Sequence, residues 1–395
     1  MRWKQTGVLV AILVVAALLR LWRIDQIPPG FHFDESFEGL EAWRIYTDPT
    51  YRPIFLQGNF GVPPLNAYAN ALTFALFEWA GGEAGPTAMR VTAAILGVLG
   101  IWAVFALGQE LRQRSPEVVP AVLPWLTAIS LATMRWHLHF SRMGIEPVMV
   151  PLLWATAMWL LLRAWRTGAW WAYAALGMIL ALGMYAYQGA WVIPPLVAFT
   201  ALHLLWVDHA ARAEQSRRWG GLIMAGVLAV VGVLPLVLFF VEQPDLLILR
   251  PAQIAIVGQT ASPADSTIGD ALWATAKMFG PLGAPGDADP RRNLPGAPAL
   301  NFWQAIPFYL GLLVTLWHSR RMGQRQGVTM AIVLVGLVGL LLPGMISEYA
   351  PHFHRILGAA APVALLCGMG LASLWRATRT LTAPVSRLAG PIVVA

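Results

Sequence analysis

The chain has 395 residues, a length that would suit two or three soluble domains, but its composition excludes a soluble protein. Hydrophobic residues make up 57% of it and charged residues only 12%, about half the charged share of a soluble globular protein. The net charge of +7 does not indicate nucleic-acid binding, because no basic run is dense enough. The single cysteine, Cys367, excludes both a disulfide framework and a cysteine metal site. Nineteen tryptophans and repeated apolar blocks instead predict an all-α polytopic membrane protein, with one transmembrane domain over residues 1–395.

Ten apolar stretches approach the ~20 residues that a helix needs to cross a ~30 Å bilayer core. They are 6–23, 88–109, 117–135, 146–163, 169–185, 190–207, 219–241, 301–317, 327–346 and 355–375. The first is typical of a signal peptide in its basic start, but no small-residue cleavage site follows it, so we interpret it as an uncleaved anchor. The apolar residues 388–395 are compatible with the start of an eleventh span.

Basic residues set the predicted orientation. With the N-terminus in the cytoplasm, the short inner connections hold 15 of the 27 basic residues and only four acidic ones. The inner arginines include Arg112, Arg114, Arg163, Arg166, Arg212, Arg217, Arg218, Arg320, Arg321, Arg325, Arg376 and Arg379. Two long segments, 24–87 and 242–300, then lie outside the cell membrane. The polar residues able to do chemistry are therefore predicted to be extracytoplasmic.

The stretch 65–80 is apolar too, but we do not expect it to span the membrane. It contains Asn66, Asn70 and Glu78 and is short for a span. A crossing there would also place every later arginine pair outside. We expect a helix lying at the outer interface.

The first outer segment begins with a Pro28-Pro29-Gly30 turn followed by two adjacent carboxylates, Asp34 and Glu35. Helical spacing then places Phe33, Phe37, Leu40 and Trp43 on one face, with Glu38 and Glu41 facing away. This pattern predicts an amphipathic helix on the membrane that begins at Asp34. Two interpretations of the pair are open: Asp34 caps the helix and Glu35 favours its dipole, or the pair performs chemistry.

This arrangement resembles the GT-C glycosyltransferases, and more specifically family 39, which contains protein O-mannosyltransferases and aminoarabinose transferases that modify lipid A. The specific elements are Asp34-Glu35 and Gly61-Val62-Pro63-Pro64-Leu65-Asn66. Shorter similarities are Ala88-Met89-Arg90, Phe140-Ser141-Arg142, Gly286-Asp287 with Arg292-Asn293-Leu294-Pro295-Gly296, and His354-Arg355. The resemblance implies a GT-C-like fold of about ten transmembrane helices with amphipathic juxtamembrane helices in the first outer loop.

The resemblance also implies inverting transfer of a sugar from a polyprenyl-phosphate donor to an acceptor hydroxyl on the extracytoplasmic side of the cytoplasmic membrane. In that reaction Asp34 corresponds to the general base, which takes the proton of the acceptor hydroxyl. Glu35 would orient or tune it, since two close carboxylates repel and raise the proton affinity of one of them. The acceptor class stays open between protein, lipid and polysaccharide. No cofactor is implied, and no nucleic acid.

The departing lipid phosphate requires a cation, and arginine's planar fork suits phosphate oxygens. The candidates are Arg90, Arg142, Arg250, Arg292 and Arg355, with Arg142 and Arg355 preferred because each lies where a span meets a short outer loop. The alternative for each is an interfacial arginine that reaches lipid headgroups or pairs with an acid. The family's Glu-Lys pair or His before Pro-Pro-Leu is replaced here by Gly61 and Val62, so another residue must supply that cation.

Other polar groups have weaker assignments. His354 and Tyr187 are candidate substrate-binding residues, although Tyr185, Tyr187, Gln188 and Trp191 also suit an interfacial aromatic belt. His32, His137, His139, His352 and His354 show no four-ligand spacing, so we expect no metal site. Residues 281–298 are predicted to form an irregular loop, with a lid as one interpretation.

Two other classes of function compete with the transferase. A transporter or flippase of a lipid-linked saccharide would need ionisable residues deep within spans and paired repeats, and the spans here are nearly free of charge. A membrane anchor or sensor is disfavoured because no soluble domain is attached. The sequence therefore favours the glycosyltransferase.

Overall fold

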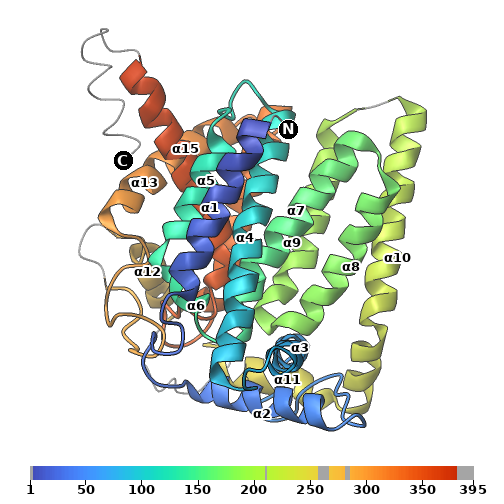
Figure 1. Cartoon of the computed structure of the whole chain (residues 1–395). Coiled ribbons are helices and arrows are strands. Elements are labelled where there is room, and N and C mark those ends of the chain that lie inside the picture. Colours follow the sequence, from blue (N-terminus) through green and yellow to red (C-terminus); the bar gives the residue numbers. More distant parts are fainter. Residues whose placement is uncertain (1–2, 210, 257–266, 281–284, 380–395) are drawn as a thin grey trace.

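The computed structural model describes residues 3–209, 211–256, 267–280 and 285–379. Within these residues the protein is helical and contains no β-strand, only isolated bridges between Leu56 and Val62 and between Ala255 and Ser347. The long helices stand side by side (Figure 1): α1 (Trp3–Leu21), α4 (Pro86–Arg114), α5 (Leu123–Thr133), α7 (Met149–Thr167), α8 (Trp170–Ala186), α9 (Ile193–Val207), α10 (Arg212–Glu242), α13 (Phe302–Ser319), α14 (Arg325–Met345) and α15 (Ala360–Arg379). The shorter elements are α2 (Phe33–Thr47), α3 (Leu65–Trp79), α6 (Arg135–Phe140), α11 (Pro244–Ile254), α12 (Ile268–Lys277), η1 (Glu146–Val148), η2 (Gln188–Val192) and η3 (Leu357–Ala359).

Each of the ten predicted spans overlaps one of these ten side-by-side helices. Among the described residues, six helical segments are long and apolar enough to cross a bilayer, and shorter apolar helices occupy Thr6–Leu21, Leu123–Thr133 and Trp170–Ala186. The protein is therefore a multi-pass, all-α membrane protein, as the sequence predicts. The number of crossings stays a prediction, and residues 388–395 lie outside the described residues.

One predicted span, 117–135, differs in the structure. Only Leu123–Thr133 forms α5, and residues 115–122 form turns before it. Pro116, Pro120 and Pro124 explain the difference, because proline lacks the N–H of a helix interior and is tolerated only in the first turn.

Two helices of the first outer segment lie across one end of the bundle. In Figure 1, α3 is seen almost end-on and α2 runs beneath it, whereas the long helices stand upright. Helix α3 covers the stretch that was predicted not to span, and its orientation agrees with a helix parallel to the membrane plane.

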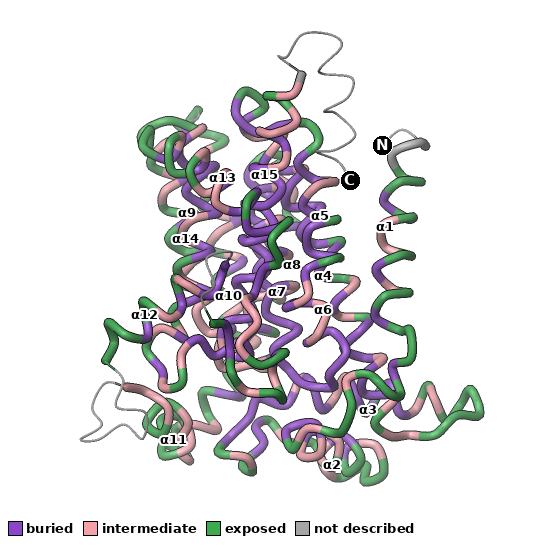
Figure 2. Tube along the Cα trace, turned by 90° about the vertical axis from the view of Figure 1, so that its left-hand side faces the viewer, coloured by how far each residue is buried: buried purple, intermediate pink, exposed green. Residues whose placement is uncertain are grey.

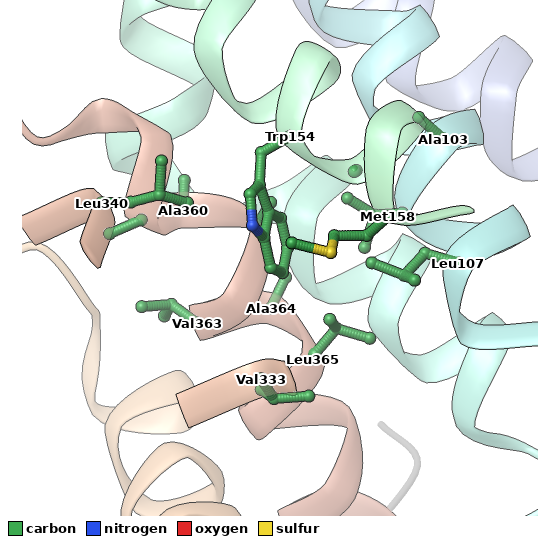
Figure 3. Packing of buried hydrophobic residues seen from close by; sticks show 14 of the residues in the cluster. Ala103, Leu107, Trp154, Met158, Val333, Leu340, Ala360, Val363, Ala364 and Leu365 are labelled. Atoms are coloured by element: carbon green, nitrogen blue, oxygen red, sulfur yellow. The ribbon is translucent and has the colours of Figure 1, made fainter. Parts of the chain in front are cut away.

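Small residues allow the long helices to pack closely around a buried core. Figure 2 shows the buried residues concentrated in the middle of the bundle. At its centre the fully buried indole of Trp154 lies among Met158, Leu340 and Ala364 (Figure 3). A Cβ added to Gly336 would lie 2.2 Å from that indole, so the α14 backbone contacts the ring directly. Such close approach is typical of helix packing in membranes, where small residues let backbones meet.

The two ends of the bundle differ in charge. At the end that we call the basic end (residues 110–116, 163–167, 208–218 and 320–325), Arg114 pairs with Asp208 at 2.6 Å and Arg166 with Glu110 at 2.7 Å. The opposite end, here the cavity end, holds residues 24–85, 243–256 and 285–300, which lie within the two predicted outer segments or at their borders. The predicted inner connections therefore meet at one end and the predicted outer segments at the other.

This separation can be tested by cysteine labelling. Cys367 is the only cysteine and is buried, so background labelling should be low. Cysteine substitutions at the exposed Pro116 and Ala288 lie at opposite ends. On intact cells an impermeant maleimide should label Ala288→Cys but not Pro116→Cys, and both should react after permeabilisation. Labelling of Pro116→Cys on intact cells would contradict the predicted orientation.

Candidate active site

Helix α2 begins with a cap that the sequence does not suggest. The His32 ring accepts a hydrogen bond from the Asp34 N–H (3.1 Å), and the Glu35 carboxylate accepts one from the His32 N–H (3.0 Å). The helix therefore starts at Phe33, and the interpretation of Asp34 as its cap is wrong because His32 takes that place. The carboxylate of Asp34 is left without a capping role.

Among the described residues, the Asp34 carboxylate has one hydrogen-bonded oxygen and one oxygen that accepts no hydrogen bond. Its Oδ1 accepts a hydrogen bond from the Asn59 amide at 2.9 Å. Its Oδ2 lies 3.4 Å from Nδ1 of His32, but that nitrogen already accepts the Asp34 N–H. Burial lowers the pKa of His32, which favours the neutral ring that this acceptor role requires. Oδ2 is therefore available to accept a proton from a ligand.

A tight turn in the Pro-Pro-Leu segment delivers the Asn59 amide. Asn59, Phe60 and Gly61 all have positive φ angles, of 49°, 64° and 86°. A Cβ at Gly61 would lie 2.9 Å from the Phe55 ring, so both the backbone conformation and the space require glycine there. The turn therefore explains why glycine occupies position 61, where the family places a charged or imidazole side chain.

Asp34 lies on the wall of a cavity of about 370 Å³ at the cavity end, which we call the Asp34 cavity. Four guanidinium groups line it, but only two carboxylates, those of Asp34 and Asp289. The lining residues with polar side chains are His32, Asp34, Arg250, Asp289, Arg291, Arg292, Tyr349, His352, His354 and Arg355. The cavity therefore carries excess positive charge beside one available carboxylate oxygen.

Two of the four arginines are neutralised by acids of their own loop. Arg292 donates to Asp287 at 2.8 Å, and Arg291 forms an ion pair with Asp289 at 2.5 Å. Asp287 also accepts the Phe353 N–H at 2.9 Å, which joins the loop to the chain before α15. The described part of the loop, 285–298, is irregular as the sequence predicts. Residues 281–284 lie outside the described residues.

The other two arginines have no carboxylate partner among the described residues. Arg355 donates to the backbone oxygen of Glu348 at 2.9 Å, and the Arg250 guanidinium lies 5.8 Å from the centre of the Phe60 ring. Burial lowers the pKa of Arg355 to about 10, so its guanidinium is still charged at neutral pH. These two cations are the groups best placed to meet an anion.

Two predicted phosphate ligands, Arg90 and Arg142, do not line the cavity. Arg90 pairs with Glu35 at 3.3 Å and donates to the backbone oxygens of Ile24, Pro28 and Gly30. Arg142 donates to the backbone oxygens of Leu19, Trp22, Arg23 and Ile27. Both guanidinium groups are thus used to fix the segment between α1 and α2.

Glu35 points away from Asp34 and away from the cavity. Its carboxylate accepts hydrogen bonds from Arg90 and from the Gly144 N–H at 2.9 Å, in addition to the His32 N–H. Consecutive helical residues are ~100° apart around the axis, so the two carboxylates face different neighbours. The contacts make Glu35 an anchor of α2.

His354 lines the cavity, and two residues lie behind it. The Tyr187 ring stacks on His354 with centroids 5.6 Å apart, and Glu146 Oε1 is 3.9 Å from His354 Nε2. The rest of the aromatic group is bonded elsewhere: Tyr185 donates to Gly232 and Trp191 to Met184. Glu146 is a residue that the sequence reasoning missed, although it follows Arg142 by four positions in an apolar block.

A second missed residue is Glu38, which is 1% exposed and lies beside the Asn66 side chain of α3. Burial, then the charge of Glu146, raises the pKa of Glu38 well above its usual range. Within the described residues no group of three or more histidine, cysteine, aspartate or glutamate side chains could hold a metal ion.

These features define a class: the fold is that of the GT-C glycosyltransferases, and the resemblance seen in the sequence is confirmed at this level. Residues 61–239 match the family model of dolichyl-phosphate-mannose-protein mannosyltransferases. The match begins after Asp34 and Glu35. No curated protein matches the chain.

Two solved structures show the likeness in three dimensions. ArnT from Cupriavidus metallidurans bound to undecaprenyl phosphate has a TM-score of 0.64 at 14% identity, over 97% of this chain and 67% of that one. The oligosaccharyltransferase AglB from Archaeoglobus fulgidus, in complex with an inhibitory peptide and a dolichol-phosphate, has a TM-score of 0.58 at 15% identity, over 96% of this chain and 51% of that one. The chain thus spans about half the length of the Archaeoglobus enzyme.

The buried Glu38 gives a prediction for stability against pH. Because its folded pKa is raised, the unfolded chain binds fewer protons than the folded one above the ordinary carboxyl pKa of ~4.3, and stability falls as pH rises through that window. Glu38→Gln removes this loss. In thermal unfolding in detergent, the melting temperature of the variant relative to that of wild type should rise steadily from pH 5 to pH 8.

Glu83→Gln is the matched control, because Glu83 is an exposed carboxylate and its loss should shift stability little. Parallel pH profiles for wild type and Glu38→Gln would contradict the assignment of Glu38 as a proton-holding group.

Proposed function

We propose that the protein is an inverting glycosyltransferase that moves a sugar from a polyprenyl-phosphate donor to an acceptor hydroxyl. The observation that carries the proposal is the Asp34 cavity, whose lining combines the Asp34 carboxylate with two guanidinium groups, those of Arg250 and Arg355, that have no carboxylate partner within the described part of the chain. The family match and the two similar structures, one bound to undecaprenyl phosphate and the other in complex with a dolichol-phosphate, support a lipid-phosphate donor.

Asp34 acts as the general base in this proposal. As the acceptor oxygen attacks the anomeric carbon, its proton passes to Asp34 Oδ2, and Asn59 holds the other oxygen in place. The bond from the anomeric carbon to the phosphate oxygen breaks on the opposite face, and its electron pair leaves with the lipid phosphate. The acceptor oxygen attacks from the face opposite the departing phosphate, and this inverts the configuration at the anomeric carbon.

Arg250 and Arg355 stabilise the departing phosphate. Negative charge develops on that group during the reaction, and preplaced cations in a water-poor cavity act strongly on it. Arg250 of α11 lies against Phe60, next to Gly61, and so stands beside the position where the family's cation is missing. His354 and Arg292 line the same cavity, whereas Tyr187 supports His354 from behind. Arg90, Arg142 and Glu35 position α2.

The cavity end is proposed to face the extracytoplasmic side of the cytoplasmic membrane, with the N-terminus inside. The excess of basic over acidic residues in the connections of the basic end supports this orientation, because cytoplasmic connections of membrane proteins carry such an excess. The isoprenoid donor then enters from the outer leaflet, and a hydroxyl of a protein, lipid or polysaccharide approaches from the aqueous side.

Asp34→Asn tests the base directly. The amide keeps the shape of the side chain and cannot accept the proton, so the turnover number should fall by about 10²–10⁴-fold. Binding of the lipid-linked donor, measured by native mass spectrometry, should persist. Asp25→Asn, an exposed acid of the same segment, is the control and should transfer labelled sugar normally. Wild-type turnover in Asp34→Asn would contradict the assignment of Asp34 as the general base.

Arg250→Gln tests the phosphate contact. Loss of a charge-assisted hydrogen bond should weaken donor binding by about tenfold to a hundredfold, with fold stability unchanged. Arg44→Gln is the matched control, because Arg44 also lies over an aromatic ring, that of Tyr51 at 3.9 Å, but outside the cavity. Equal donor affinity in the two variants would contradict a role of Arg250 in binding.

A further inference from the structure

A second polar cavity, of about 210 Å³, lies at the basic end, opposite the Asp34 cavity. The C-terminal turns of α4 and α7 meet the N-terminal turns of α10 and α14 there, together with Asp208 between α9 and α10. At ~30 Å³ per liquid water molecule its volume equals about seven waters, which leaves room for a phosphate group.

The acids of this cavity are fully engaged. Asp208 accepts from both terminal nitrogens of Arg114, at 2.6 and 3.1 Å, and from the Trp165 indole at 2.8 Å. Glu110 accepts from Arg163 and Arg166, and Glu214 accepts from Arg218. The cavity lining holds four guanidinium groups, those of Arg114, Arg166, Arg218 and Arg325, and three carboxylates, so one positive charge is in excess.

Arginine side chains and helix N-termini supply donors at the cavity. Arg218 is 8% exposed and lines the cavity; its two terminal nitrogens donate to the Asp208 backbone oxygen (2.8 Å) and to Glu214 (2.5 Å), so each keeps a second N–H. Among the described residues, helices α10 and α14 both begin here without a side-chain cap for their first N–H groups. Helix N-termini and guanidinium groups are donors that bind phosphate in proteins.

Exposed tryptophans mark the depth of this cavity in the membrane. Trp170 and Trp171 open α8, Trp206 lies at the end of α9 and Trp219 near the start of α10, and all four are exposed. Tryptophan is enriched at the headgroup level of bilayers. These donors therefore lie where lipid phosphates are found.

From this juxtaposition we infer that the cavity at the basic end binds the phosphate of an anionic phospholipid headgroup, at a site separate from the Asp34 cavity. The phosphate accepts from Arg218, Arg114 and the first N–H groups of α10 and α14. Arg325, whose side chain is 61% exposed and 3.5 Å from Asp208, lines the same cavity and adds a further cation.

The test uses delipidated full-length protein in detergent and three probes: dioctanoyl phosphatidylglycerol, dioctanoyl phosphatidylcholine and inorganic phosphate. Thermal shift and native mass spectrometry report binding. We expect phosphatidylglycerol to stabilise the protein and the other two to do so weakly. Arg325→Gln should weaken phosphatidylglycerol binding about fivefold, and Arg218→Gln should weaken it more.

Arg320→Gln is the matched control, since Arg320 is an exposed arginine of the same connection that stacks on Trp317 instead. Because Arg325 is exposed, its variant keeps the test valid even if Arg218→Gln does not fold. Equal losses in Arg320→Gln and Arg325→Gln would show a diffuse charge effect and overturn the site. Inorganic phosphate binding as tightly as the lipid would overturn the lipid assignment, and so would equal binding of the two lipids.

Discussion

The position of Asp34 depends on two buried arginines that hold the segment between α1 and α2. Arg90 and Arg142 together bond seven backbone oxygens of residues 19–30, and Arg90 also pairs with Glu35. Carbonyl groups buried without a partner are costly, and this segment has no strand or helix of its own to satisfy them. The arginines supply those donors, and Glu35 fastens the first turn of α2 to the same point. Asp34, one position earlier, is thereby turned toward the cavity.

The helical architecture could be predicted because its signal, hydropathy, extends over about twenty residues at a time. Each apolar stretch of about twenty residues contains a helix, whatever its local propensities, since the membrane requires every backbone group to be bonded within the segment. The signal weakened at 117–135, where hydropathy is high but three prolines prevent the helix from starting before Leu123. The predicted start of α2, at Asp34, is also wrong for a local reason. The His32 ring caps the helix, whereas N-cap preferences favour Asp at that position.

The site was only partly accessible from the sequence. Four of the site residues predicted from the sequence line one cavity: Asp34, Arg292, His354 and Arg355. Three others lie outside its lining: Arg90, Arg142 and Glu35. The sequence shows that an arginine is interfacial but does not show which way its guanidinium points, and here backbone oxygens that no pattern reveals determine the direction. Glu38 was missed because an acid on the polar side of an amphipathic helix is expected to face water. In this chain that side packs against α3, and the apolar side is the exposed one.

Arginine is used differently at the two ends of the protein, and the difference bears on function. Every carboxylate of the basic-end cavity is bonded to an arginine, so most of the charge there is compensated inside the fold. In the Asp34 cavity, Arg355 is desolvated enough for its pKa to fall to about 10 and still has no carboxylate partner among the described residues. A partly buried cation without an ion-pair partner reduces the stability of the empty protein, since the cost of its removal from water is only partly offset by the charge of Glu348. Under the proposed function a bound phosphate would offset that loss, which would link donor binding to fold stability through Arg355. The excess positive charge of the cavity suits an anionic ligand, and the proposed base, Asp34, lies on the same cavity wall.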